Sequence, residues 1–420
     1  MNTMLQSLFN AWKLPDLRKR LLFTALIIGI YRLGCFIPVP GIDLEAISGL
    51  TSGGGAFGFL NLFVGGALER VAVFALGIMP YVTASIIMTL LTVVVPSLAA
   101  LAKEGEAGQK KINQYTRYFT AALGFIQAIF FLFLFKSEGA FGGESQLTWF
   151  NGTLVVLTLT VGTVLIMWLG ELITQRGIGN GISLIIFASI VSRLPSGLYK
   201  MFTTMNPLYW VLMAVIALLV IAAIVYIQEG QRRIPVQYAK RVVGRRVYGG
   251  QSTYLPLRVN MAGVIPVIFA SSVLILPVTL AQMTPWAWAQ SLANAIGPSS
   301  WWYLAAEVLL IVFFTYFYTA VQFNPLDQAD NLKKYGGFIP GIRPGRPTAQ
   351  YLDRVLTRIT LPGALFLAAI ALLPQALIMG LNVPFYFGGT SILIVVGVAL
   401  DTMKQMEAQL LMRHYEGLLK

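Results

Sequence analysis

The residue types that most often carry catalysis or metal binding are scarce in this chain of 420 residues. Cys35 is the only cysteine, so thiolates cannot build a metal cluster and no disulfide can form within the chain. His414 is the only histidine, which excludes a zinc-protease motif because that motif needs two. We therefore expect no enzyme activity and no cofactor.

Two glycine-containing runs have the composition of a nucleotide-binding loop but not its pattern. The run Gly105–Lys110 has the wrong spacing for a P-loop. The run Gly177–Gly181 follows no predicted strand, and we interpret it as a tight turn that opens a membrane helix. No nucleotide-driven step is indicated.

Ionisable residues inside the apolar segments are few. Arg32 lies within the first of these segments, and Glu171 and Glu307 lie near the ends of others. An ion-coupled secondary transporter would show paired intramembrane carboxylates or broken helices around a midplane site, and the carboxylate pairs are missing. A membrane-embedded enzyme would need a set of catalytic residues inside the membrane. The sequence favours a passive conduit over both alternatives.

The elements that position these residues are long apolar segments. The chain is 57% hydrophobic and 11% charged, whereas soluble domains carry about 25% charged residues. Runs of about 18 or more apolar residues predict membrane-spanning helices. We predict ten spans, of which the fifth and tenth are short: 20–37, 73–95, 117–135, 150–170, 181–194, 208–228, 259–280, 303–323, 358–378 and 388–403.

The positive charge of the chain, +13 in total, predicts its orientation. With the N-terminus in the cytoplasm, most of the 30 Lys and Arg residues fall in cytoplasmic segments, as the positive-inside rule requires, and the C-terminus is cytoplasmic too. Two of these segments, about 228–258 and 324–357, are longer than a topology signal needs. They are either such a signal or a docking surface for a partner.

The outer segment Gly53–Glu69 contains an apolar stretch that is too short to span the membrane. A re-entrant segment must be buried in protein or line a water-filled cavity, because lipid cannot satisfy its backbone. The segment is therefore either a plug or gate, or a helix lying on the outer surface.

Several blocks of sequence resemble the SecY family of bacterial protein-conducting channels. They follow in family order over nearly the whole chain and are closer to the bacterial than to the archaeal or eukaryotic branch: Phe74–Tyr81, Arg245–Tyr248, Asn260–Pro266, Ala329–Lys334, Gly341–Gly345 and Val383–Ser391. The resemblance implies an all-α polytopic membrane protein with ten transmembrane helices in two pseudo-symmetric halves around a central pore. It implies halves at 1–194, with a plug at about 54–69, and at 195–403, followed by a cytoplasmic tail at 404–420.

The resemblance also implies a function. Such a channel translocates unfolded secretory polypeptides across the bacterial plasma membrane and releases hydrophobic segments sideways into it. The expected partners are SecE and SecG subunits, the SecA ATPase, the ribosome, signal peptides, nascent chains and membrane lipids.

The resemblance assigns roles to individual residues. Val82 stands where isoleucine is common, which should widen the pore slightly. The implied pore ring is Ile78, Val82, Ile182, Ile186, Ile268 and Ile394; the plug includes Phe57, Leu60, Phe63 and Val64; the lateral gate includes Thr83, Ile86, Gln127 and Ser272; and the docking residues are Arg245, Arg246, Arg343 and Arg346. The polar gate residues could equally make ordinary helix–helix hydrogen bonds.

Overall fold

The fold is described from a computed structural model of the chain. It describes residues 14–42, 61, 63–137, 141, 148–204, 206–238, 241–243, 246–248, 252–283, 291, 300–381 and 389–418. Each predicted span overlaps one helix: α2 (Pro15–Gly34), α5 (Met79–Val94), α7 (Glu106–Ser137), α8 (Trp149–Arg176), α9 (Gly181–Thr204), α10 (Pro207–Glu229), α11 (Ile265–Met283), α13 (Trp301–Gln322), α15 (Arg346–Leu381) and α16 (Gly389–Leu418).

Six of the described helices are long and apolar enough to cross a bilayer on their own. A seventh crossing is possible if α5 and the following α6 (Pro96–Lys103), which are bent by 97° at the break between them, count as one span. Lipid offers the backbone no hydrogen-bond partners, so helices of this composition satisfy their own polar groups within the membrane. The chain is therefore a multi-pass helical membrane protein, and the prediction of ten spans is consistent with it.

Two helices begin later than the apolar pattern predicts. Helix α5 starts at Met79 rather than at residue 73, and α11 starts at Ile265 rather than at 259. The preceding residues form turns in which Gly77 and Gly263 have positive φ angles of 58° and 63°. Glycine adopts this backbone readily, whereas a hydropathy pattern does not register it.

The fifth and tenth helices are longer than the predicted short spans. Helix α9 continues through Pro195 to Thr204, and α16 continues to Leu418. The two apolar ranges therefore mark only the first part of each helix, and a mixture of polar and apolar residues forms the rest.

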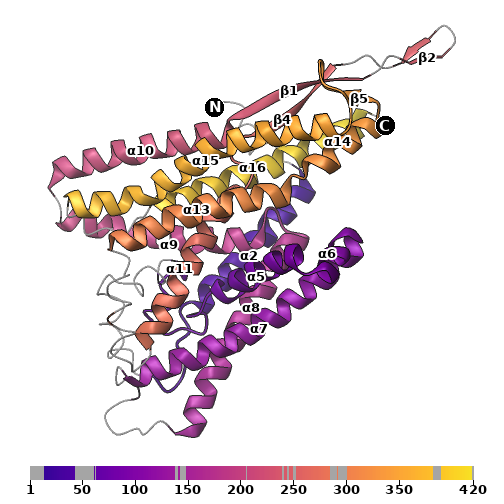
Figure 1. Cartoon of the computed structure of the whole chain (residues 1–420). Helices are drawn as coiled ribbons and strands as arrows, with labels where there is room; N and C mark the ends of the chain where they lie inside the picture. The colour runs from indigo at the N-terminus through magenta and orange to yellow at the C-terminus, as the bar shows by residue number, and fades with distance from the viewer. Residues whose placement is uncertain are drawn as a thin grey trace.

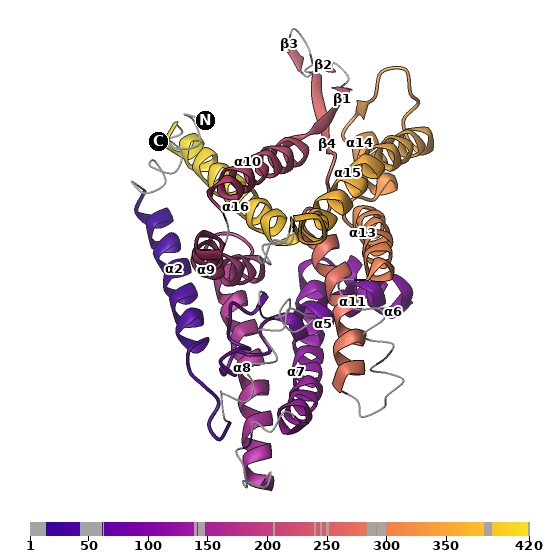
Figure 2. The ribbon, with the colours of Figure 1, turned by 90° about the vertical axis from the view of Figure 1, so that its left-hand side faces the viewer.

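The helices pack in two groups that follow the order of the chain. In the first half, α7 packs on α5 and α8, and α8 packs on α2 and α9. In the second half, α13 packs between α11 and α15, and α16 packs on α15 and α10. The halves meet where α11 contacts α5 and α7 and where α16 contacts α9, and Figure 2 shows the second half above the first.

A small sheet projects from the helices of the second half (Figure 1). Strand β1 (Gln231–Tyr238) pairs antiparallel with β4 (Ser252–Arg258) on one edge and with β5 (Gly337–Phe338) on the other. Along β1, Ile234 and Val236 are buried between exposed neighbours, as expected for a strand with one covered face. They pack with residues of β4, with Ile339 directly after β5 and with the first turns of α15 in a separate apolar cluster.

Three shorter elements complete this end of the molecule. Strands β2 (Arg241–Val243) and β3 (Arg246–Tyr248) form the tip of the β1–β4 hairpin, and α14 (Pro325–Lys334) packs on α15. Figure 1 shows the sheet, α14 and α6 at the same end. The two long basic segments predicted from the sequence thus form one folded unit.

Candidate pore, plug and docking surface

The structure brings the six predicted ring residues into one apolar cluster at the junction of the halves. Five of them are at most 5% exposed, and Ile182 is half-buried against the same cluster. They come from four helices, two in each half, with the following members: Ile78 and Val82 at the start of α5, Ile182 and Ile186 on α9, Ile268 on α11 and Ile394 on α16. Residues separated by more than 300 positions meet here.

Two pairs of ring residues, Ile78 with Val82 and Ile182 with Ile186, are four positions apart, and the members of each pair lie one turn apart. The amide of Val82 donates to the carbonyl of Ile78 at 3.0 Å, although Ile78 itself is the residue that precedes the helix. Ile182 and Ile186 lie in the first turns of α9, where the side-chain oxygen of Asn180 accepts a hydrogen bond from the amide of Ile182 at 3.1 Å. The local hydrogen bonds therefore fix where each ring side chain points.

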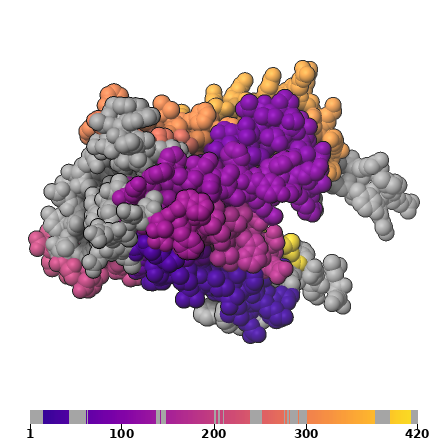
Figure 3. All heavy atoms as spheres, turned by 90° about the horizontal axis from the view of Figure 1, so that it is seen from below, coloured from indigo at the N-terminus to yellow at the C-terminus, as the bar shows by residue number. Residues whose placement is uncertain are grey.

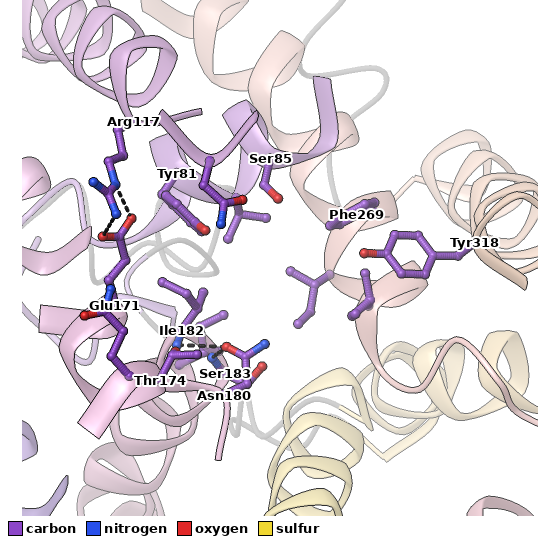
Figure 4. A pocket seen from close by; sticks show the side chains of 16 residues that line it. Tyr81, Ser85, Arg117, Glu171, Thr174, Asn180, Ile182, Ser183, Phe269 and Tyr318 are labelled. Atoms are coloured by element: carbon purple, nitrogen blue, oxygen red, sulfur yellow. Dashed lines mark hydrogen bonds and ion pairs between the residues drawn. The ribbon is translucent and has the colours of Figure 1, made fainter. Parts of the chain in front are cut away.

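A cavity of about 320 Å³ opens directly on the ring. Its apolar lining includes Val82, Ile182, Ile186 and Ile268, so four ring residues form part of its wall. In Figure 4, polar residues of the first half face Phe269 and Tyr318 of the second half across this space. We call it the funnel cavity.

One ion pair forms part of the polar wall of the funnel cavity. The guanidinium of Arg117 on α7 binds the carboxylate of Glu171 on α8 through two contacts of 2.7 Å (Figure 4). This bidentate geometry fixes both groups and ties the two helices together. The wall is thus polar, but its charges neutralise each other.

The described end of the predicted plug lies against the ring. Phe63 is 3% exposed and Val64 is 2% exposed, and both belong to the same apolar cluster as the ring residues. A Cβ added at Gly77 would lie 3.0 Å from a methyl group of Val64, so this glycine permits the close approach. Phe57 and Leu60, which were also assigned to the plug, lie outside the described residues.

Polar contacts attach this segment to α2 and α9. The guanidinium of Arg32 donates to the carbonyl of Gly65 at 3.0 Å, and the hydroxyl of Tyr31 lies 3.4 Å from the carbonyl of Val64. The same tyrosine hydroxyl shares a hydrogen bond of 2.6 Å with the hydroxyl of Ser189. The carbonyl groups of Val64 and Gly65 are therefore paired with side chains, as buried backbone requires.

A second attachment holds the residues that follow. The guanidinium of Arg193 on α9 forms an ion pair of 2.5 Å with the carboxylate of Glu69, and the amide group of Asn61 donates to the same carboxylate oxygen at 3.3 Å. The backbone amide of Glu69 donates back to Asn61 at 3.3 Å. We call this trio the plug latch.

The plug latch changes the titration of its carboxyl group. Partial burial acts to raise the pKa of Glu69, but the hydrogen bond and positive charge of Arg193, with Asn61 and Arg70, hold the pKa below its ordinary value. Glu69 is therefore ionised at neutral pH, and the latch is an ion pair.

The predicted lateral-gate residues lie on helices that meet across the two halves. Ile86 and Ser272 are buried, and Thr83 and Gln127 are half-buried. The hydroxyl of Thr83 donates to the carbonyl of Met79 at 3.0 Å, and that of Ser272 donates to Ile268 at 2.6 Å. Both hydroxyls thus bond within their own helix rather than across the seam.

Three of the four predicted docking residues, Arg246, Arg343 and Arg346, fall in the projecting unit. Arg343 and Arg346 are both exposed. Arg343 lies in the turn before α15, between Gly341 and Gly345, whose φ angles are 81° and 102°, and Arg346 is the first residue of α15. Arg245 lies outside the described residues. The backbone of Arg246 belongs to strand β3, which carries it to the tip of the hairpin.

Figure 3 shows the face formed mainly by the first half, with the basic α14–α15 region rising beyond its edge.

Sequence reasoning missed the residues that contact the predicted plug on this half, Tyr31 and Ser189 among them. For the latch a signal existed, because Glu69 lies in the predicted outer segment, Arg193 lies at the outer end of the predicted span 181–194, and the two carry opposite charges. The hydroxyl pair gives no signal, since 158 positions separate its members.

A helical membrane protein with a closed apolar constriction between two halves has the architecture of a channel. The family model that matches the chain is SecY, over residues 72–403. The chain is 50% identical to the protein translocase subunit SecY of Streptomyces scabiei over 441 residues, covering 99% of this chain and 100% of that protein. It is 48% identical to the subunit of the same name from Corynebacterium glutamicum, with the same coverage. The chain belongs to the SecY family.

Solved structures agree on the fold. A structure described as that of a protein conducting channel matches 93% of this chain and 91% of its own, with a TM-score of 0.62 and 20% sequence identity. A canine Sec61 structure from a ribosome–channel complex matches with a TM-score of 0.59 and 18% identity, and it covers the same shares of the two chains.

Proposed function

We propose that this protein is the polypeptide-conducting pore of a bacterial plasma-membrane translocase. It passes unfolded secretory chains through the ring and releases hydrophobic segments sideways into the membrane. The observation that carries the proposal is the ring, which joins aliphatic residues of four helices beneath the funnel cavity. Family membership at 50% identity over the full length supports it.

An aliphatic ring suits this task for two physical reasons. It offers ions no ligands, and apolar constrictions of this kind gate by losing their water. It also makes no obligatory hydrogen bonds, so it can deform around side chains of any type. Both properties follow from its composition, since all six members are isoleucine or valine.

Phe63 and Val64 act as the inner end of a plug that closes the resting pore. They pack in the same apolar cluster as Ile78, so the plug and the ring bury each other in the closed state. The lateral gate opens between two pairs of helices, one formed by α5 and α7 and the other by α11 and α13. Thr83 and Ser272 line that seam without bonding across it, so separating the helices breaks no hydrogen bond that either of them makes.

The projecting basic unit is the docking surface for the SecA motor and the ribosome. Exposed arginines suit phosphate and carboxylate partners because the guanidinium binds both in bidentate fashion. With this unit in the cytoplasm, both termini are cytoplasmic, and the chain is a pore driven by its partners rather than an enzyme. The SecE and SecG subunits complete the complex.

Ring variants test the proposal in planar bilayers. Replacing Ile78 and Ile268 with asparagine places polar atoms in the constriction and lets water enter it, so the resting ion conductance should rise. Deleting residues 57–68 should raise it as well. Lipid-facing Leu219 on α10 is 65% exposed, and Leu219→Asn is the matched control. Unchanged conductance in the ring variants would refute the assignment.

A further inference from the structure

The stretch between Glu69 of the plug latch and α5 contains a residue with an unusual backbone. Val71 has a positive φ angle of 42°, and among the described residues it is the only one that does so without being a glycine. A left-handed backbone brings the Cβ of an L-residue too close to the following carbonyl oxygen, and for a β-branched residue it is a genuine outlier. Val71 is also 0% exposed, so its surroundings hold it in this conformation.

Two backbone hydrogen bonds explain why Val71 adopts this conformation. The amide of Val71 donates to the carbonyl of Leu68 at 3.1 Å, and the amide of Ala72 donates to the carbonyl of Ala67 at 2.8 Å. This nested pair around a left-handed residue is the Schellman motif that ends many helices. Glycine usually occupies the left-handed position because it has no Cβ. Here a valine occupies it, so the turn closes only with strain in the backbone.

The Schellman motif crosses the boundary of the predicted plug. Its two acceptors, Ala67 and Leu68, belong to the predicted plug segment at about 54–69, and its two donors follow that segment. Residues 71–73 pair antiparallel with residues 37–39, which follow α2, through two hydrogen bonds of 2.9 Å. A plug that leaves the pore must therefore break both bonds of the motif, while the pairing of 71–73 with 37–39 can remain.

The side chain of Val71 explains how the strained conformation persists. It belongs to the same buried apolar cluster as Val39, before the plug segment, and Leu159 on α8. Residues in unfavourable backbone regions persist only where the surrounding structure over-determines them. By contrast, Gly65 and Gly77 in the same stretch have φ angles of 66° and 58° without a Cβ to strain them.

We propose that Val71 is a strained joint that favours opening of the plug. The proposal rests on the proposed function and concerns the plug of that same pore. While the plug is closed, the Schellman motif holds Val71 in the left-handed conformation. When Ala67 and Leu68 leave, both bonds of the motif break and Val71 relaxes to a negative φ angle. The relaxation favours the open state about fivefold, the equivalent of about 1 kcal/mol.

A comparison of glycine with alanine at position 71 tests the joint in planar bilayers. Both variants remove the valine methyl groups, but only Val71→Gly also removes the Cβ that strains the closed state. The resting conductance of Val71→Gly should therefore be about fivefold below that of Val71→Ala. Equal conductance of the two variants, or a larger conductance of Val71→Gly, would overturn the proposal.

The control substitution is Ala72→Gly, at a neighbouring residue that is 0% exposed and has no positive φ angle. Here glycine relieves no strain and only removes packing, so the resting conductance should rise above that of the unmodified protein. A fall in conductance would show that glycine closes the pore at any position in this stretch, and it would overturn the assignment to Val71.

Deleting residues 57–68 tests the link to the plug, because it removes both acceptors of the Schellman motif. In this background Val71→Gly and Val71→Ala should conduct alike, and a fivefold difference that persists would overturn the link. Melting temperatures of the assembled complexes report on folding and on strain. With the plug present, Val71→Gly should melt above Val71→Ala, since alanine at a positive φ angle destabilises the fold. The opposite order would overturn the strain.

The ring variant with both Ile78→Asn and Ile268→Asn separates the two proposals. If that variant conducts while the two variants at position 71 do not differ, the strained joint is overturned and the pore assignment stands. If the ring variant does not conduct, the proposed function fails.

Discussion

Breaking the plug latch should make the resting channel leak. The carboxylate side chain of Glu69 is 52% exposed and the guanidinium side chain of Arg193 is 26% exposed. Exposed ion pairs contribute about 0.2–1 kcal/mol, and the better-buried guanidinium and the extra bond from Asn61 place this one near the upper end. Removing about 1 kcal/mol from the closed state should raise the population of the open state roughly fivefold.

The measurement is the resting conductance of single complexes in planar bilayers. Glu69→Gln and Arg193→Gln should each raise the fraction of time in the conducting state by about that factor. Because the two residues act as a pair, the double variant should leak no more than either single variant. The control Glu106→Gln breaks an ion pair that is almost fully exposed and far from the plug, and it should change nothing.

Acidification should reproduce the effect through Glu69. Its pKa is lowered in the folded state, so its stabilising contribution is complete above the ordinary glutamate pKa of about 4.3 and disappears as the pH falls through the lowered value. Leak should therefore rise only in strong acid and stay flat between pH 5 and pH 8, and Glu69→Gln should abolish the acid rise. Strictly additive leak in the double variant, or an acid response that survives Glu69→Gln, would refute the latch.

Two further outcomes follow from packing and from charge. Gly162→Ala should lower the melting temperature, because the added Cβ would lie 2.0 Å from the carbonyl oxygen of Val73 and overpacking costs about 1–3 kcal/mol. The control is Gly29→Ala, whose added Cβ would have nothing within 4 Å. Equal melting temperatures of the two variants would contradict the packing. The Arg343→Glu protein should insert in the membrane normally but lose SecA-driven export, measured in inverted vesicles. The control Arg18→Glu reverses a charge outside the projecting unit and should keep export. Full export by the Arg343 variant would contradict the docking role.

Hydropathy and charge alone predicted the class of protein and the approximate place of every span. They could not place the start of α5, because Val73–Ile78 is as apolar as the helix that follows and only the backbone of Gly77 shows the turn. The projecting sheet could not be predicted from the sequence either, because Ile234 and Val236, the alternating buried residues of β1, fall in an arginine-rich segment.

The site was predictable to a different degree. Ile182 and Ile394 are ordinary aliphatic residues in membrane helices, and only the resemblance to a family singled them out. The contacts of Tyr31 with Ser189 and of Arg193 with Glu69 join segments more than 120 residues apart. Such pairs depend on how the last turn of α2 and the middle of α9 meet the plug segment, which no local pattern specifies.

Capture of a polypeptide in transit at the ring tests the central claim most directly. A photo-cross-linking probe at Ile268, compared with one at lipid-facing Leu219, should be measured in complexes that hold a stalled secretory chain. We expect cross-links to the chain from Ile268 at every stalled length and none from Leu219. Equal yields from both positions, or no cross-link from Ile268, would contradict a pore through the ring.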